Sequence, residues 1–138
     1  MGKEVILNIS TLRWANQVFE PTWNREYIES VQIVFKEDLG LGGRGGYFDT
    51  FGIIRDIMQN QLLQIMLWIG MDPPEDMSAA KIREAKVELL RCIETLHFDA
   101  NDCFLGQFGP SEAHPGYLDD ETVPKDSRCP TFCVAAAA

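Results

Sequence analysis

The sequence predicts an α+β fold in which helices pack against a sheet that the chain leaves incomplete. Residues 52–69 carry a stripe of apolar side chains at helical spacing, and an amphipathic helical pattern follows Ser78. Residues 27–36 alternate between apolar and polar side chains, which is typical of a half-buried strand. Residues 131–138 are apolar and strand-like, so we expect other strands of the sheet to lie elsewhere and its open edge to associate.

The composition indicates one globular domain and excludes two kinds of partner. The 138 residues are 46% hydrophobic, which is sufficient for a core. The formal net charge of -9 repels nucleic acid and anionic membrane surfaces. The longest apolar run, residues 62–71, is shorter than the roughly 20 residues of a membrane span, and no signal peptide is visible. We therefore expect no nucleic acid or membrane partner and no targeting segment.

The first helix is predicted over residues 3–19. Val5, Ile9 and Leu12 stand at i, i+4 and i+7 and therefore share one helical face. A proline two residues beyond the pattern ends it.

The later elements follow in order. Residues 52–69 are apolar almost all round in their second half, so we expect this helix to have neighbours on several sides. Ser78 is the N-cap of the next helix. Residues 103–108 form a short strand candidate, and residues 109–130 form a long loop rich in proline, glycine and acidic residues.

Two polar residues lie within the apolar helix. Gln61 stands four residues after Ile57 and therefore in the apolar stripe, whereas Asp56 points about 140° away at roughly 100° per residue. Each must then find its partner in another segment. One interpretation is structural, with Gln61 a buried, hydrogen-bonded amide and Asp56 paired to a base such as Arg55 or Arg13.

Glu37 follows the predicted strand at 27–36, on the face that carries Val31, Ile33 and Phe35. A carboxylate at the end of a core-facing row is costly unless a ligand or water reaches it. Glu37 therefore either meets a ligand or marks the point where the strand emerges into solvent.

Gly40, Gly42 and Gly45 have the G-x-G-x-x-G spacing of a dinucleotide-binding turn. The second parallel strand of a Rossmann unit, with an acidic residue near its end, does not follow the helix. We therefore predict a flexible loop whose glycines permit turns with positive φ.

The chain has four cysteines, namely Cys92, Cys103, Cys129 and Cys133, and two histidines, His97 and His114. They form no C-x-x-C pair, so we expect no metal site and no Cys/His catalytic pair. We expect reduced, mostly buried thiols, with lower burial for the two cysteines that flank Pro130.

Residues 44–61 read R-G-G-Y-F-D-T-F-G-I-I-R-D-I-M-Q-N-Q. Apart from its last residue, this segment resembles a motif of glucose-6-phosphate dehydrogenases. Further matches in family order are G-K-E at 2–4, L-R-W-A-N at 12–16, F-x-P-x-W-N-R at 19–25, F-K-E at 35–37, L-G-Q at 105–107, G-Y-L-D-D-x-T-V-P at 116–124 and P-T-F at 130–132. The resemblance covers nearly the whole chain.

The resemblance implies a fold and a reaction. Members of the family join a Rossmann domain for NADP to a larger α+β domain, in which helices pack on one side of an antiparallel sheet. They oxidise glucose 6-phosphate to 6-phosphogluconolactone in the pentose phosphate pathway. Residues 1–138 correspond to the first part of the second, substrate-binding domain, so we expect an incomplete antiparallel sheet and no Rossmann domain.

The resemblance also implies roles for four residues. Lys3 matches the lysine that contacts the sugar phosphate, although an ordinary exposed lysine at a helix start is the alternative. Glu37 and Asp56 match acidic residues that hydrogen-bond sugar hydroxyls. Gln61 occupies the position of the histidine base, and an amide cannot accept the proton that an imidazole accepts.

These departures lead to an expectation about activity. The family's Asp-His-Tyr ahead of Gly-Lys, its NADP domain and its later strands are not in this chain. We therefore expect the chain alone to lack dehydrogenase activity, to bind no NADP and to bind glucose 6-phosphate weakly at best. One alternative is a non-catalytic interaction protein that forms a homo-oligomer or pairs with a full-length relative. The other is an incomplete gene model of an active enzyme.

Overall fold

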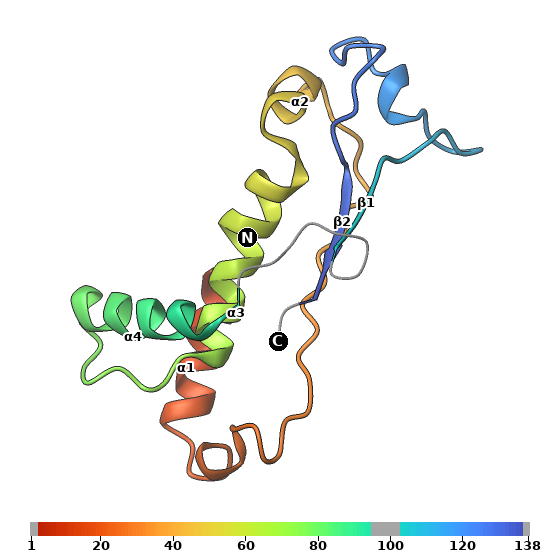
Figure 1. Ribbon diagram of the computed structural model, residues 1–138. Helices are drawn as coiled ribbons and strands as arrows, with labels where there is room; N and C mark the ends of the chain where they lie inside the picture. Colours follow the sequence, from red (N-terminus) through yellow and green to blue (C-terminus); the bar gives the residue numbers. More distant parts are fainter. Residues whose placement is uncertain (1–2, 95–102, 137–138) are drawn as a thin grey trace. The chain divides into compact units, whose positions relative to one another are not determined.

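The computed structural model describes residues 3–94 and 103–136 (Figure 1). The elements in this part of the chain are helices α1 (Lys3–Trp14), α2 (Gly45–Ile53), α3 (Leu63–Gly70) and α4 (Ala79–Cys92), strands β1 (Cys103–Gly106) and β2 (Phe132–Ala135), the π-helical segment η2 (Ile54–Leu62), and the short 3-10 helices Glu20–Thr22 and Tyr117–Asp119. They divide into two compact units, residues 1–34 with 62–93 and residues 35–61 with 94–138. Each unit is described by itself.

The first unit has a small helical core. Trp68 and Met71, at the end of α3, are buried with Ala85 of α4. Half-buried side chains from α1 and α4 pack against them, namely Ile6, Trp14, Ile82 and Leu89. Gly70 permits the close approach of α3 and α4, because a Cβ there would lie 3.0 Å from Cδ2 of Leu89.

Helix α1 confirms the predicted helix but ends five residues earlier, at Trp14. The predicted face is wrong in part: Leu12 is exposed, and the buried side chains are Ser10 and Arg13. Arg13 is buried because its Nη1 donates to the carbonyl oxygens of Trp68 at 2.8 Å and Met71 at 2.9 Å. A pattern of apolar residues cannot reveal a charged side chain that is buried by such bonds.

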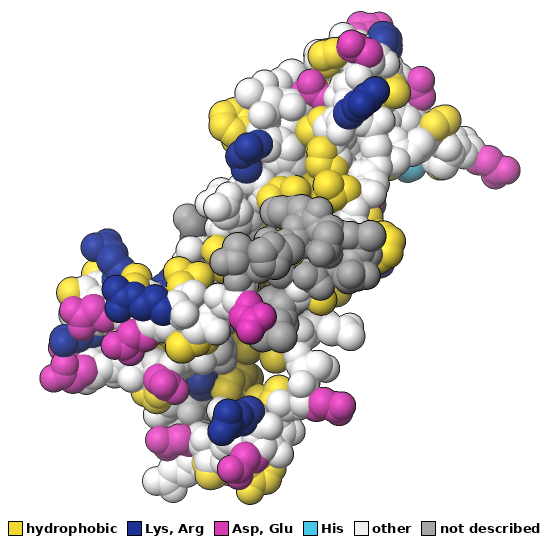
Figure 2. Space-filling model, in the orientation of Figure 1, with side chains coloured by type: hydrophobic (Ala, Val, Ile, Leu, Met, Phe, Trp, Pro, Cys, Tyr) yellow, Lys and Arg dark blue, Asp and Glu magenta, His cyan; other side chains and the backbone are white. Residues whose placement is uncertain are grey.

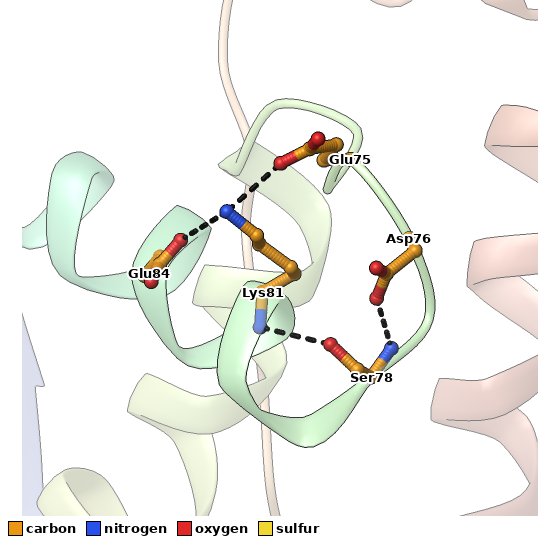
Figure 3. A network of polar contacts seen from close by, with 5 residues as sticks. All are labelled: Glu75, Asp76, Ser78, Lys81 and Glu84. Carbon is orange, nitrogen blue, oxygen red and sulfur yellow. Dashed lines mark hydrogen bonds and ion pairs between the residues drawn. The ribbon is translucent and has the colours of Figure 1, made fainter.

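Helix α4 begins at the predicted N-cap (Figure 3). The Ser78 hydroxyl accepts a hydrogen bond from the Lys81 amide at 3.4 Å, and the Ser78 amide donates to Asp76 at 2.7 Å. The Lys81 ammonium lies between two carboxylates, 2.8 Å from Glu75 and 3.1 Å from Glu84. Its hydrogen bond to Glu75, followed by that to Glu84, raises the pKa of Lys81. Because these groups are exposed, the pairs add little to stability.

The second unit contains an antiparallel two-stranded sheet. The pairing of β1 with β2 runs from Cys103 opposite Ala135 to Gly106 opposite Phe132. Both strands lie within the segments predicted as strands, and residues 137–138 of the second prediction lie outside the described residues. The architecture is that of a small α+β domain with an incomplete antiparallel sheet, as expected.

The strand predicted at residues 27–36 is wrong. This segment carries no strand, and the sheet among the described residues consists of β1 and β2. Only the exposure of successive side chains alternates as predicted: Ile33 and Phe35 are half-buried, whereas Val34 is 71% exposed. A periodic sequence forms a strand only where a partner satisfies its backbone groups, and no segment within residues 3–94 and 103–136 pairs with this one.

The helix predicted at residues 52–69 is also wrong in its bounds and its regularity. Helical structure begins at Gly45, breaks at Gly52 (φ 71°, ψ 164°), continues as the π-helical η2 and becomes α-helical again in α3. Gly42 and Gly43 have φ values of 57° and 80°, which confirms the predicted glycine loop with positive φ. Glycine supplies both the loop and the break, because it adopts positive φ without steric cost.

Charged side chains of both signs are interspersed on the face drawn in Figure 2, including the part formed by α4, and hydrophobic atoms lie among them. Of the helices in the described ranges, none combines the length and apolar composition needed to cross a bilayer.

The prediction of mostly buried thiols is wrong, since Cys92 is exposed and the other three cysteines are half-buried. All four are free thiols.

Candidate functional site

Three of the four predicted site residues belong to the second unit. Asp56 and Gln61 lie in η2 and are half-buried. Glu37 is exposed in the irregular segment before α2, and because residues 27–36 form no strand it does not mark a strand end. Lys3 begins α1 in the first unit, and its side chain lies outside the described part of the structure.

The π-helical segment changes the relation between Asp56 and Gln61. In a π-helix the hydrogen bonds join residues five apart, so each turn holds more residues than an α-turn. Asp56 and Gln61 are five apart, the spacing that π-helical hydrogen bonds join, so the predicted angle of 140°, which assumes a regular α-helix, does not apply. A run of nine π-helical residues is unusual, since such geometry is mostly confined to single turns and is frequent at functional sites.

The partner of Asp56 is Tyr47, which sequence reasoning missed. The Tyr47 hydroxyl donates to Oδ1 of Asp56 at 3.4 Å, a long and exposed hydrogen bond. The Tyr47 ring packs on Phe51 of the same helix, with 4.6 Å between the ring centroids. The predicted pairing with Arg55 or Arg13 is wrong, because Arg55 donates to the carbonyl oxygen of Phe51 and Arg13 to those at the end of α3. The break at Gly52 separates Tyr47 from Asp56, so helical spacing could not reveal the pair.

A second carboxylate of the same motif, Asp49, organises a hydrogen-bond network. The Tyr117 hydroxyl donates to Oδ1 of Asp49 at 2.9 Å, and the Ser127 hydroxyl donates to the same oxygen. The Cys129 amide donates to the Ser127 hydroxyl at 3.1 Å. Tyr117 is fully buried, and this burial, followed by the hydrogen bond to Asp49, raises the pKa of Tyr117. Through these hydrogen bonds Asp49 links α2 to Tyr117 and Ser127 of the long loop, which is a structural role.

A cavity of about 580 Å³ opens beside this network. Its lining includes Asp49, Gly52, Arg55, Arg128 and Cys129. Neither Glu37 nor Asp56 nor Gln61 lines it. The cavity and the predicted sugar-binding residues are therefore different parts of this unit.

The glycine loop does not fit the diphosphate of a dinucleotide. A Cβ at Gly45 would collide with the side chains of Thr122 and Val123, so the close approach at Gly45 is made by the chain itself. Gly42 and Gly43 have open space around them, and the described sheet has no parallel strands. These residues lack the strand-turn-helix setting that holds a pyrophosphate.

No group of three or more His, Cys, Asp or Glu side chains within residues 3–94 and 103–136 is placed to hold a metal ion. His97 lies outside these ranges. Among the predicted site residues, Glu37 and Asp56 offer carboxylate acceptors and Gln61 offers an amide.

Comparison with known proteins gives a consistent result. A family model described as "Glucose-6-phosphate dehydrogenase, C-terminal domain" matches residues 10–138. The chain is 50% identical over 139 residues to the glucose-6-phosphate 1-dehydrogenase of Aspergillus niger, and 51% identical over 137 residues to that of Dictyostelium discoideum. These alignments cover 99% and 98% of this chain and 27% of each relative. The chloroplastic enzyme of Nicotiana tabacum is 50% identical over 99% of this chain and 23% of the relative.

Two solved structures are similar throughout. A glucose-6-phosphate dehydrogenase in complex with its substrate glucose-6-phosphate superposes with a TM-score of 0.88 at 44% identity, over 99% of this chain and 28% of that chain. Glucose-6-phosphate 1-dehydrogenase from Mycobacterium avium superposes with a TM-score of 0.86 at 31% identity, over 96% of this chain and 28% of that chain. The present chain thus spans about a quarter of the length of the relatives it matches.

Proposed function

Because the chain belongs to the glucose-6-phosphate dehydrogenase family and matches its C-terminal domain, we propose that residues 1–138 supply part of the sugar-binding side of such a protein. The family reaction is the NADP-dependent oxidation of glucose 6-phosphate to 6-phosphogluconolactone. The observation that carries the proposal is the placement of Asp56 and Gln61 on successive turns of one π-helical segment within the family motif.

Two side chains of the second unit would contact the sugar. Asp56 is half-buried and held on one side by Tyr47, so its second carboxylate oxygen is available to a sugar hydroxyl. Glu37 is exposed and could accept from another hydroxyl. The family resemblance assigns Lys3, in the first unit, to the phosphate, a role that suits a compact cation. Exposed groups bind weakly because water competes for each hydrogen bond. We therefore expect weak binding.

We further propose that this chain does not catalyse the oxidation. The reaction requires a base beside the anomeric hydroxyl, and position 61 holds an amide. Gln61 can orient a hydroxyl by hydrogen bonding, but it cannot take up the proton at neutral pH. Binding without proton removal leaves glucose 6-phosphate unchanged.

NADP is the cofactor of the family, and when bound it accepts the hydride from the sugar. The described glycine loop does not fit a dinucleotide, and we propose that this chain alone does not bind NADP. We therefore expect that Gln61→His by itself restores no turnover. The compartment we propose is the cytoplasm or a plastid, since four plant relatives carry the designation chloroplastic.

Binding and turnover can be tested separately. Calorimetry with glucose 6-phosphate should give weak binding that Asp56→Asn reduces further, whereas Glu112→Gln, an exposed carboxylate in the loop, should leave it unchanged. An assay of the purified chain with glucose 6-phosphate and NADP should give no NADPH. Turnover by the chain would refute the proposed inactivity, and equal binding by the Asp56→Asn variant would refute the assignment of the sugar face.

A second function is favoured by the exposed apolar strands. Phe104 of β1 is 66% exposed, and Phe132 and Val134 of β2 are 55% and 51% exposed. A two-stranded sheet has unpaired backbone groups on both outer edges, which pair readily with another chain. We propose as the alternative that the chain pairs with a full-length relative or with itself. Co-purification of the tagged chain with an intact relative, lost in Val134→Lys, would support it, and a monomer that captures no relative would oppose it.

A further inference from the structure

The sheet of the second unit brings two thiols into contact. Sγ of Cys103 and Sγ of Cys133 lie 3.7 Å apart. Cys103 stands opposite Ala135, and Cys133 stands opposite Leu105, so the cysteines are diagonal neighbours. Residues two apart in a strand point to the same side, so both thiols lie on one face of the sheet.

We propose that Cys103 and Cys133 form a reversible disulfide that links β1 to β2. A disulfide needs about 2.05 Å between its sulfurs, so the present contact must shorten by roughly 1.7 Å. Diagonal neighbours have Cα atoms about 7–8 Å apart, beyond the usual disulfide range of roughly 4.4–6.8 Å, so bridging requires the backbones of the two strands to move closer. The two side chains already span this separation, because their sulfurs are in contact. Side-chain rotation and a slight approach of the strands complete the geometry.

The other two cysteines are engaged elsewhere. Sγ of Cys92 donates to the carbonyl oxygen of Glu88 within α4, and Sγ of Cys129 donates to that of Phe48. Neither makes a contact with another thiol among the described residues. The structure therefore selects one pair out of four cysteines.

The surroundings of the pair make it accessible but slow to react. Both cysteines are half-buried, so a small oxidant can reach them. Sδ of Met58 lies 3.8 Å from Sγ of Cys133 and covers it on one side. Burial raises the pKa of the Cys133 thiol to about 11. Little of its thiolate is therefore present near neutral pH, and the exchange proceeds slowly.

The oxidant that we infer is a small-molecule disulfide such as oxidised glutathione. The thiolate of one cysteine attacks a sulfur of this disulfide, whose S–S bond breaks and releases one small thiol. The thiolate of the other cysteine then attacks the protein sulfur of the mixed disulfide and releases the second small thiol. Two protein thiols are oxidised, one small disulfide is reduced to two thiols, and the two protons pass to the released thiolates.

The link closes a loop of 30 residues, which includes the long segment between the strands. A two-stranded sheet is marginally stable by itself, so a covalent link between its strands matters. In the chain-entropy treatment, closure of this loop favours the folded over the unfolded state by about 400-fold. The bridge therefore couples the order of this unit to the redox state of its surroundings.

Mass spectrometry tests the proposal on the wild-type chain. The native protein is equilibrated with reduced and oxidised glutathione over a series of ratios, quenched in acid, alkylated and digested. We expect the number of alkylated cysteines to fall from four to two, with one linked peptide that contains Cys103 and Cys133. Four alkylated cysteines at every ratio, a link to Cys92 or Cys129, or bound glutathione without an internal link would each overturn the proposal.

Matched variants separate proximity from reactivity. Cys92→Ala and Cys129→Ala should form the same link as the wild type, and Cys103→Ser should form none. In the double variant Cys103→Ala with Phe104→Cys, the thiol moves one position and so points to the opposite face of the sheet. We expect no link there, and a link that forms equally well in this variant contradicts the geometric assignment.

Discussion

Arg13 of α1 completes the end of α3 by donating from its Nη1 to the carbonyl oxygen of Trp68 at 2.8 Å. The same nitrogen donates to the carbonyl oxygen of Met71, and the Trp23 indole donates to that of Ile69 at 2.8 Å. The last carbonyls of a helix have no partner within the helix, so these donors satisfy groups that burial would otherwise leave unpaired. The donors lie 46 to 58 positions before their acceptors in the sequence, and together they stabilise the end of α3.

The first prediction concerns this contact. Arg13→Leu should lower the free energy of unfolding by about 2–4 kcal/mol, because it removes two charge-assisted hydrogen bonds and leaves buried carbonyls without donors. Urea unfolding followed by tryptophan fluorescence measures the loss. Arg83→Ala, at an exposed position of α4, is the control and should stay within about 0.5 kcal/mol of the wild type. If both variants lose the same free energy of unfolding, the hydrogen bonds of Arg13 stabilise the protein no more than an exposed side chain does.

The sequence predicts much of the fold, and its failures share one physical origin. The N-cap Ser78 and the apolar pattern after it locate α4 because both signals are local. The strands β1 and β2 lie where short apolar segments predict them. The segment at 27–36 fails because a strand depends on a partner, which its own period cannot supply. The burial of Arg13 is not predicted because it depends on hydrogen bonds to the end of a helix far along the chain.

The candidate site shows the same limit. The resemblance to the family motifs, which occur in the same order, identifies Asp56 and Gln61 as site residues. The predicted angle between them, however, assumes a regular α-helix. The break at Gly52 and the π-helical segment change that angle, and neither has a periodic signal in the sequence. Tyr47 and Asp49 stand in the same motif, yet their hydrogen-bond partners appear only once the chain is folded.

The second prediction concerns the break at Gly52, whose φ of 71° and ψ of 164° favour glycine strongly. Gly52→Ala should destabilise the protein by about 1–3 kcal/mol, because a side chain at these angles is strained. Thermal unfolding followed by circular dichroism measures the change. Gly40→Ala is the matched control, since Gly40 has open space around it and no positive φ. A Gly52→Ala variant as stable as the Gly40→Ala variant would refute the strained geometry.

The third prediction concerns Tyr117 and Asp49. Tyr117→Phe should lower stability by about 1.5–3 kcal/mol, because the Asp49 carboxylate loses a buried donor and, among the described residues, keeps Ser127 alone. Chemical denaturation at pH 7 measures the loss. Tyr27→Phe, at a residue that is 67% exposed, is the control and should have little effect.

The same pair predicts a dependence on alkaline pH. Burial raises the pKa of Tyr117 above its usual value of about 10, so the folded state keeps a proton that the unfolded state loses. The contribution of Tyr117 is complete below pH 10 and declines as the pH rises above it. Unfolding curves from pH 8 to 11 should show this decline in the wild type, with a shallower slope in Tyr117→Phe. Identical slopes would mean that Tyr117 titrates alike in both states.

The fourth prediction tests the π-helical relation between Asp56 and Gln61. An imidazole introduced by Gln61→His would lie one π-turn from the Asp56 carboxylate, which favours its charged form. Its pKa should therefore lie above the usual value of about 6.5, and adding Asp56→Asn should lower it. Histidine resonances followed by NMR across pH 5 to 8 measure both values.

The native histidines and the helix geometry provide the controls for this experiment. The sequence holds two other histidines, whose resonances are already present in the wild-type spectrum and so identify the new resonance by difference. In a regular α-helix the two positions would lie about 140° apart, and the Asp56→Asn change would scarcely affect the new imidazole. If Asp56→Asn leaves the pKa of the imidazole at position 61 unchanged, the π-helical arrangement is excluded in solution. A pKa that falls with Asp56→Asn supports a site in which a carboxylate and the family's base position lie on successive turns.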